Sequence, residues 1–345
     1  MTGDYNYFVQ LDKSKIDLIF RVFRGPFAGA MPMRWKKWVL TSGALSSALM
    51  LVTVAAHSQN LLDALEQTLS VNVDLVLVNA TVSDSQTGRP VTGMQGDHFQ
   101  IYEDRVEQDI QYFSAEDVPL SVGIIFDVSG SMKEKLSVAR DAAVTFLQTG
   151  SPQDEHFLVP FSGRAEVAQG FTSDIARLQN ELIFTPAGGM TALYDAVYLG
   201  LEKVKEGRNP KKALLMITDG QDNRSRYTFR NVREYVRESD VQLYAIGIVD
   251  SFSSQLGLGR TGRQLIDELA EVTGGRSFFP NSVFDLEDIT RRIAVELKNQ
   301  YVIGYLSSNK ETDGEWRDIQ VRVNPPRGAP RLSVRAKQGY YAPVR

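Results

Sequence analysis

The chain has 345 residues, of which 43% are apolar and 23% are charged, a composition typical of chains that fold into compact domains. A net charge of −4 and the lack of a basic patch in the part expected to fold argue against nucleic acid as a partner. The chain has no cysteine, which excludes disulfides, thiol catalysis and a zinc site built from cysteines.

The amino-terminal part predicts export from the cytoplasm. Residues 31–37 form a short basic region, and residues 39–56 follow without a charged side chain. Ala56 and Ser58 then place small residues at positions −3 and −1 of a cleavage site before Gln59. This order fits either a secretory signal peptide at 31–58 or an uncleaved signal anchor. We expect a periplasmic, cell-surface or secreted protein that touches a membrane only through residues 39–56.

Residues 1–30 form an extension in front of this signal, although a signal peptide should start the chain. One interpretation is that translation begins at Met31 or Met33. The other is that the extension is translated and that its apolar residues form a short amphipathic helix. A peptide from residues 1–30 in the mass spectrum of the mature protein would support the second interpretation.

The next segment, residues 59–118, is predicted to be rich in β-strands. Apolar side chains recur at every second position from Val71 to Leu77, which is the period of a half-buried strand, although Val76 and Val78 blur the alternation. Turn-forming residues occupy positions 83–90. Segments 99–104 and 110–113 have the composition of strands and are expected to pair as a hairpin.

Residues 119–298 alternate between short apolar runs and amphipathic segments. The predicted strands are Val122–Phe126, Phe157–Phe161, Ala213–Thr218 and Leu243–Val249. Helical periodicity covers Leu136–Leu147, Ala192–Val204, Phe229–Val236, Leu265–Val272 and Leu286–Lys298. Continuous apolar strands that alternate with helices predict an α/β fold, with a doubly wound, mostly parallel sheet covered on both faces.

The last segment, residues 299–345, returns to β structure. Strands are predicted at 301–306, 316–323 and 332–342, with turns rich in glycine and proline between them. Neither β-rich flank alone buries enough apolar surface to be stable. We therefore expect the two flanks to pair into one small β-sandwich, with the α/β domain inserted between them.

Five oxygen-bearing side chains follow strand ends or precede a helix in the predicted sheet. They are Asp127, Ser129 and Ser131 in the sequence DVSGS, Thr191 in GGMT, and Asp219 in TDG. Because the carboxyl ends of parallel strands share one edge of a sheet, these side chains can converge. Carboxylate and hydroxyl oxygens are hard ligands, which suit Mg²⁺ or Ca²⁺ better than zinc. The sequence therefore predicts a divalent-metal site.

The three motifs in this order resemble the von Willebrand factor type A domain with its metal-ion-dependent adhesion site, over roughly residues 119–298. The resemblance implies that Ser129 and Ser131 are direct hydroxyl ligands and that Thr191 binds directly or through water. It also implies that Asp127 and Asp219 hold the metal largely through water. Met190 is a departure from the pattern, because some relatives place threonine directly after the two glycines.

The resemblance implies a function in protein binding rather than catalysis. The cofactor would be Mg²⁺, or Mn²⁺ or Ca²⁺, and an Asp or Glu carboxylate of a partner protein would fill the open position of the metal. The flanks are also similar to those of a bacterial subgroup of secreted proteins with this domain. The segments that carry this likeness are Val91-Thr92-Gly93, Asp97-His98-Phe99, Glu103-Asp104, Gly304-Tyr305 and Gly339-Tyr340.

Two other functions remain open from the sequence. One is a structural envelope protein whose metal site is occupied by its own chain. The other is a metal-dependent phosphohydrolase with Asp127 as nucleophile, but such sites usually need a second acid where Ser129 stands. Residues 257–262, GLGRTG, fit a dinucleotide-binding pattern or a flexible loop equally well. The histidines His57, His98 and His156 are far apart and are expected at the surface or in packing.

Three further acidic or amide residues lie near the predicted site. Asp195 is expected to be a first-turn helix acid, which the helix dipole favours. Asp222 and Asn223 follow the TDG motif; they are expected either to line the rim of the site or, in preference, to be solvated loop residues.

Overall fold

A computed structural model of the protein describes residues 75–248, 258–280, 282–325, 328 and 330–344. The extension at 1–30 and the signal or anchor at 31–58 lie outside these residues. Within the described ranges, every helix is too short or too polar to cross a membrane.

A six-stranded sheet forms the centre of the α/β part of the chain. Its strands are β5 (Leu120–Asp127), β6 (Glu155–Phe161), β7 (Gln169–Thr172), β8 (Lys211–Thr218), β9 (Gln242–Gly247) and β10 (Arg276–Phe278). They lie in the order β10-β9-β8-β5-β6-β7, and all neighbours are parallel except β6 and β7. The four strands predicted from apolar runs are confirmed. The sequence did not indicate β7 and β10.

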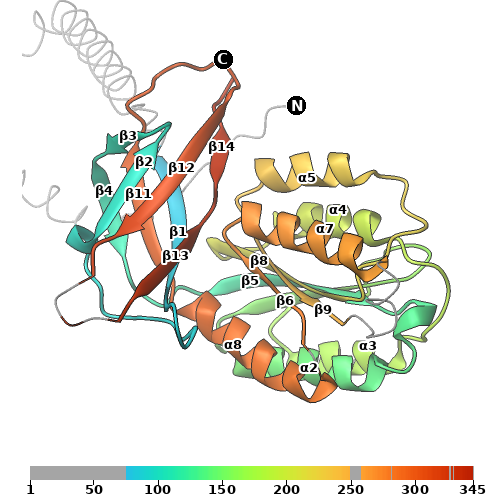
Figure 1. Ribbon diagram of the computed structural model, residues 1–345. Helices are drawn as coiled ribbons and strands as arrows, with labels where there is room; N and C mark the ends of the chain where they lie inside the picture. The colour runs from blue at the N-terminus through green and yellow to red at the C-terminus, as the bar shows by residue number, and fades with distance from the viewer. Residues whose placement is uncertain (1–74, 249–257, 281, 326–327, 329, 345) are drawn as a thin grey trace, which may run out of the picture. The chain divides into compact units, whose positions relative to one another are not determined.

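Helices cover both faces of this sheet (Figure 1). One face packs against α2 (Leu136–Thr149), α3 (Ile175–Phe184) and α8 (Leu286–Lys298), and the other against α4 (Leu193–Val204), α5 (Phe229–Glu238) and α7 (Leu258–Val272). Only α3 was missed by the sequence analysis. This arrangement confirms the predicted doubly wound α/β class.

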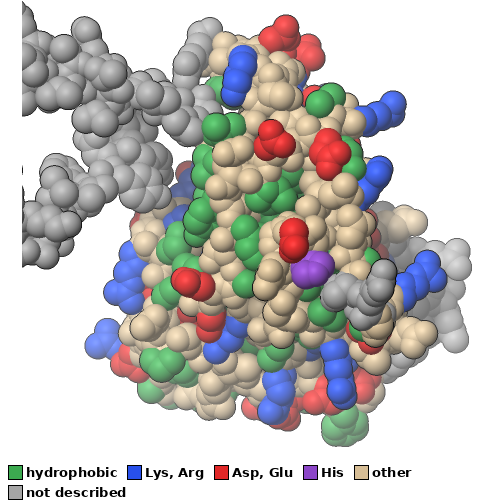
Figure 2. Space-filling view, turned by 90° about the vertical axis from the view of Figure 1, so that its left-hand side faces the viewer, with side chains coloured by type: hydrophobic (Ala, Val, Ile, Leu, Met, Phe, Trp, Pro, Cys, Tyr) green, Lys and Arg blue, Asp and Glu red, His purple; other side chains and the backbone are tan. Residues whose placement is uncertain are grey.

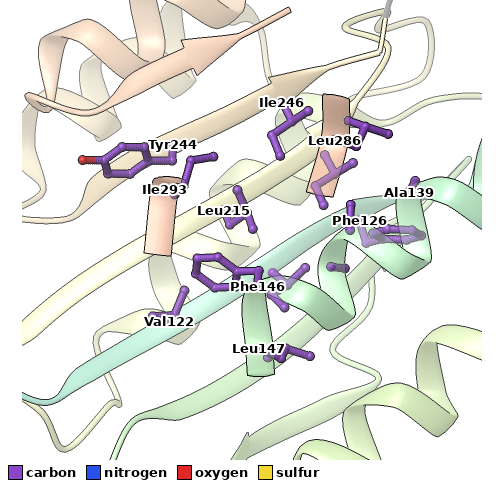
Figure 3. Packing of buried hydrophobic residues seen from close by; sticks show 14 of the residues in the cluster. Val122, Phe126, Ala139, Phe146, Leu147, Leu215, Tyr244, Ile246, Leu286 and Ile293 are labelled. Carbon is purple, nitrogen blue, oxygen red and sulfur yellow. The ribbon is translucent and has the colours of Figure 1, made fainter. Parts of the chain in front are cut away.

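The central strand β5 is buried along its whole length. Its side chains alternate between the two faces, so that Ile124 and Phe126 join one apolar cluster and Ile125 joins the other. Figure 3 shows the first cluster, in which Phe146 of α2 and Ile293 of α8 cover the strand residues. Each such side chain contributes about 1.5–3 kcal/mol by leaving water. Burial on both faces therefore fixes the position of β5 between the two helix layers.

The two β-rich flanks pair with each other, as expected from the sequence. Their strands are β1 (Leu75–Asp84), β2 (Phe99–Glu103), β3 (Val106–Gln108), β4 (Ile110–Ser114), β11 (Tyr301–Leu306), β12 (Trp316–Val323), β13 (Leu332–Ala336) and β14 (Gly339–Tyr341). They form two antiparallel sheets, β13-β1-β11-β4 and β14-β12-β2-β3. Both sheets contribute to one apolar cluster, which includes Val78, Ile101 and Ile303. Each sheet combines strands from both flanks, so neither flank forms a sheet alone.

The predicted hairpin of 99–104 with 110–113 is wrong. Strand β2 pairs with β3 instead, through a two-residue turn in which Asp104 and Arg105 have φ angles of 47° and 70°. A turn with two positive φ angles matches the twist of a tight hairpin. Strand β4 then crosses to the other sheet and pairs with β11. The predicted strand 332–342 is likewise divided, because β13 and β14 belong to different sheets.

The outer face of the sheet β13-β1-β11-β4 carries partly exposed apolar side chains, Leu75, Leu77, Tyr112 and Leu306. Three of them close over Gly304, where a Cβ atom would lie 2.9 Å from Tyr112 Cβ and 3.1 Å from Leu77 Cδ2. Figure 2, which views the molecule from the side of β3 and β4, shows hydrophobic side chains gathered between charged ones on the sandwich.

Candidate metal centre

The turn after β5 gathers three of the five predicted ligands. Asp127 Oδ1 accepts a 2.8 Å hydrogen bond from the backbone nitrogen of Ser129. This bond folds the chain sharply at the strand end and leads into the short 3-10 helix Gly130–Met132. As a result Ser129 Oγ lies 3.1 Å from Ser131 Oγ. Ser129 is buried, whereas Ser131 is exposed at the edge of the sheet.

The spacing of the two serine oxygens suits a small divalent cation. Ligand oxygens at neighbouring corners of an octahedron, each about 2.1 Å from Mg²⁺, are about 3.0 Å apart. The observed 3.1 Å separation of Ser129 Oγ and Ser131 Oγ is close to that value. The pair can therefore share a hydrogen bond or two adjacent corners of one metal ion without rearrangement.

The GGMT loop is held against this turn by backbone hydrogen bonds. Gly188 N donates to Val128 O at 2.8 Å, and Gly130 N donates to Gly189 O at 3.1 Å. Gly188 and Gly189 have φ angles of 148° and 89°, which are accessible to glycine and strained for other residues. The loop thus carries Thr191 to the edge of the sheet where the serines lie. Thr191 itself is only 3% exposed.

Asp219 reaches the same edge from β8, which is parallel to β5 and directly beside it. The hydroxyl of the preceding residue, Thr218, donates a 2.6 Å hydrogen bond to Asp127 Oδ2. Sequence reasoning did not assign Thr218 a role, although it belongs to the TDG motif. Its hydroxyl fixes the second oxygen of Asp127, while Ser129 N fixes the first.

The two carboxylates make this edge electrostatically negative. Burial raises the pKa of Asp127 to about 6, and the nearby Asp219 carboxylate adds to the rise. Hydrogen bonds from Ser129 and Thr218 oppose this effect because they favour the charged form. A divalent cation beside Asp127 would likewise favour its charged form.

The remaining donor atoms are compatible with a metal ion. Within the described ranges, Thr191 Oγ1 and Asp219 Oδ2 make no hydrogen bond, whereas Asp219 Oδ1 accepts a 3.3 Å bond from Gln221 N. The described residues contain no metal-binding group of three or more His, Cys, Asp or Glu side chains. A metal at this edge would therefore depend on the hydroxyls as much as on the two carboxylates. This donor set, rich in neutral oxygens, fits Mg²⁺, Mn²⁺ or Ca²⁺.

Asp222 and Asn223 are bound to the protein rather than simply solvated. Asn223 Oδ1 accepts a 2.9 Å hydrogen bond from Thr191 N. Asp222 Oδ2 accepts hydrogen bonds from Tyr194 N at 3.2 Å and from Ser225 Oγ at 2.5 Å. Both side chains thus tie the loop after β8 to the start of α4. No local sequence signal indicates the bonds from Thr191 N and Tyr194 N, because these partners are about thirty positions away along the chain.

Asp195 lies in the first turn of α4, as expected, and also holds a loop. Its Oδ1 accepts hydrogen bonds from Arg226 N at 2.9 Å and Tyr227 N at 3.1 Å. The carboxylate therefore orders the chain that follows the candidate metal centre.

The interpretation of the GLGRTG segment as a flexible loop is wrong for the residues that the structure describes. From Leu258 onward it belongs to α7. Gly262 permits a close approach of this helix to the loop after Asp219, because a Cβ atom at Gly262 would lie 2.7 Å from Gly220 O. The glycine therefore allows close packing of α7 beside the candidate metal centre.

An apolar cavity of about 410 Å³ lies elsewhere, between the β-sandwich and the amino ends of the parallel strands. Leu77, Tyr112 and Val241 line it, and none of the five predicted ligands does.

Residues 122–221, which contain all five predicted ligands, match the family model of the von Willebrand factor type A domain. Mouse inter alpha-trypsin inhibitor, heavy chain 4, is 26% identical to this chain over 223 residues, which are 59% of this chain. The match spans only 23% of that longer relative.

Several solved structures are similar in part. Proximal thread matrix protein 1 from the mussel byssus, with a zinc-occupied MIDAS motif, gives a TM-score of 0.45 at 17% identity, covering 58% of this chain and 50% of its own. The von Willebrand factor type A protein of Catenulispora acidiphila gives a TM-score of 0.44 at 12% identity. The match covers 79% of this chain and 73% of that protein. The PilB minor pilin of Streptococcus sanguinis gives a TM-score of 0.40 at 16% identity. The match covers 55% of this chain and 63% of the pilin.

The family model covers β5, the turn that follows it, the GGMT loop and the carboxyl end of β8, which together build the candidate metal centre. Domains of this family are typically non-catalytic adhesion modules. This chain is therefore a protein with a von Willebrand factor type A domain.

Proposed function

We propose that the chain is an exported protein-binding module that depends on a divalent metal. Ser129, Ser131 and Thr191 would supply hydroxyl oxygens to Mg²⁺, Mn²⁺ or Ca²⁺. Asp127 and Asp219 would hold the ion largely through water. A carboxylate from an Asp or Glu of a partner protein would complete the shell. The observation that carries this proposal is the 3.1 Å separation of the two serine oxygens beside a buried carboxylate.

The chemistry of the donors explains why such a site would attract an acid. The direct protein ligands would be neutral hydroxyls, and the two carboxylates would act largely through water, so the inner shell of the cation would leave its charge only partly compensated at the open position. A carboxylate from outside then gains a strong charge-assisted contact in a partly desolvated place. Ser131 and the loop residue Met190 are exposed, so this edge is accessible to a second protein.

The burial of Asp127 supports binding rather than phosphoryl transfer. An aspartyl nucleophile must reach the phosphorus atom of its substrate. Asp127 is 0% exposed, and both of its carboxylate oxygens accept hydrogen bonds from Ser129 N and Thr218 Oγ1. Its position suits a buried residue that orients the turn after β5 and the metal ligands on it.

Calorimetric titration with Mg²⁺ tests the metal centre. We expect binding to the parent protein, and a large loss of affinity in Asp127→Asn and Ser129→Ala. Asp141→Asn and Ser137→Ala change the same residue types at exposed positions of α2 and should bind as the parent does. Equal affinity for Mg²⁺ in all five proteins would show that Asp127 and Ser129 do not form a metal site.

The role of the partner is tested by pull-down from an envelope extract with and without a chelator. We expect specific proteins to be retained by the parent in Mg²⁺ and released by the chelator. The Ser129→Ala variant should retain none of them. A metal site occupied by the chain's own side chains would give magnesium binding in calorimetry but no metal-dependent capture.

A further inference from the structure

A hollow of about 750 Å³ lies beside the candidate metal centre, over α4 and the loops that follow β6 and β8. Arg164, Arg224 and Arg226 line it together with the aromatic rings of Tyr198 and Tyr227. A surface that combines arginines with aromatic side chains is the composition typical of protein-binding hot spots. The lining of the hollow is therefore suited to contact with a protein partner.

The walls of the hollow are the same loops that hold Thr191. The backbone nitrogens of Asn223 and Arg224 donate to Thr191 O at 3.0 and 3.1 Å. On the other side, Ala192 N donates to Ser162 O at 2.7 Å, two residues before Arg164. Because the same loops hold Thr191 and line the hollow, the hollow is within reach of a segment bound through an acid at the metal, in which each extended residue spans about 3.3 Å.

Arg224 carries the uncompensated charge in this hollow. Arg226 pairs with Asp195 at 3.2 Å, Arg164 pairs with Glu166 at 2.7 Å, and Glu202 of the lining pairs with Lys205 at 2.8 Å. The guanidinium of Arg224 has no ion-pair partner in the described part of the chain. It is exposed and offers a planar pair of donors that matches a carboxylate.

The aromatic floor is already ordered. The ring of Tyr198 stacks on Tyr227, with 4.2 Å between centroids, and on Tyr235, with 4.6 Å. Asp195 fixes the backbone of Tyr227 through a 3.1 Å hydrogen bond. A partner side chain that packs on this floor would therefore not have to pay for ordering the rings.

We propose that this hollow is the specificity pocket for the same partner, and that it selects a segment with a second acid and an aromatic or large apolar side chain near the metal-binding acid. The second acid would pair with Arg224, and the apolar side chain would pack against Tyr227 and the edge of the Tyr198 ring. This proposal rests on the proposed function, because it assumes that the first acid is bound through the metal.

Selection from a random-peptide display library on the full chain in Mg²⁺, with elution by EDTA, tests the proposal. We expect the eluted peptides to carry two acids and an aromatic residue close together. Selection on Arg224→Gln should retain one acid and lose the preference for the second, and a selected peptide should bind that variant roughly tenfold more weakly in fluorescence anisotropy. Arg224→Lys should recover part of the loss. Arg177→Gln, an exposed change on α3, should behave as the parent.

The outcomes separate this proposal from the one on which it rests. If no peptide is eluted by EDTA, metal-dependent protein binding itself is contradicted. If EDTA-eluted peptides carry a single acid and bind the parent and Arg224→Gln equally, the metal-dependent function stands and the specificity pocket is refuted.

Discussion

Thr218 Oγ1 donates a 2.6 Å hydrogen bond to Asp127 Oδ2, and this bond joins the carboxyl ends of the neighbouring strands β8 and β5. The same hydroxyl accepts a 3.1 Å bond from Gly220 N. One buried side chain therefore sets the orientation of Asp127 and the direction in which the chain leaves Asp219. The geometry of the candidate metal centre depends on it although it is not a predicted ligand.

The first prediction concerns this hydroxyl. Thr218→Val keeps the shape of the side chain but removes both hydrogen bonds, so Asp127 should lose its fixed orientation. We expect the affinity for Mg²⁺ to fall about 10- to 100-fold, as for other residues that orient metal ligands. Thr218→Ser retains the hydroxyl and should bind close to the parent in calorimetry. If the valine variant binds Mg²⁺ as tightly as the serine variant, Thr218 does not position the site.

The second prediction concerns the contact of α7 with the loop after Asp219. In Gly262→Ala, the new Cβ atom would lie 2.7 Å from Gly220 O, so the loop must shift. Alanine favours a helix by about 1 kcal/mol over glycine, and this gain should offset the cost of shifting the loop. The free energy of unfolding should therefore change little. Magnesium affinity should nevertheless fall about tenfold. Gly170→Ala, which has nothing within 4 Å of its Cβ position, is the control. Loss of stability without loss of affinity would contradict this explanation.

The elements that the sequence predicted well share a strong local signal. Strands such as β5 and β8 are continuous apolar runs, because helices bury both of their faces. The predicted ligands stand directly after those runs or before a helix, so their edge of the sheet could be inferred from topology alone.

The elements that were missed obtain their structure from distant partners. All four residues of β7 are only half-buried, so they form no apolar run, and the three residues of β10 are placed by pairing with β9. The hairpin of β2 and β3 turns at Asp104 and Arg105, which lack the usual glycine. The bond from Thr191 N to Asn223 Oδ1 spans 32 positions, and no local pattern reports it.

The third prediction concerns pH. His156 in β6 is buried, and its Nδ1 has no hydrogen-bond partner. Burial lowers the pKa of His156 to about 4, although Asp154 and Glu155 oppose the shift. In the unfolded chain the histidine titrates near pH 6.5. Above about pH 6.5 the histidine is neutral in both the folded and the unfolded state. Below that pH the histidine of the unfolded chain takes up a proton, whereas His156 in the folded protein stays neutral down to about pH 4.

The free energy of unfolding should therefore fall between about pH 6.5 and pH 4, by up to about 3 kcal/mol from this residue. His156→Phe should lack this part of the pH dependence while keeping the contribution of the carboxylates. Urea denaturation of both proteins at about pH 7.5 and about pH 4.5 measures the difference. Parallel losses of stability in the two proteins would show that His156 does not titrate in this way.

The fourth prediction concerns a buried ion pair between α8 and β13. Glu296 is 0% exposed, and its carboxylate lies 2.5 Å from Arg335 Nη2 and 3.7 Å from Arg276 Nη1. Burial raises the pKa of Glu296, and the two arginines oppose the rise. Arg335→Met leaves the charge with Arg276 and Arg292 but without its nearest partner, so we expect the free energy of unfolding to fall by about 3–5 kcal/mol at neutral pH.

The pH dependence of that loss identifies its cause. Without Arg335 the pKa of Glu296 should rise further, so protonation as the pH falls removes the uncompensated charge and should shrink the deficit. Replacing both residues, in Arg335→Met with Glu296→Leu, should recover most of the stability in urea denaturation, because no buried charge is left unpaired. Arg177→Met breaks an exposed pair with Asp174 and should cost less than about 1 kcal/mol. A deficit in Arg335→Met that is the same at every pH, and that the second substitution does not repair, would mean that lost packing of the arginine stem, rather than its charge, joins β13 to α8.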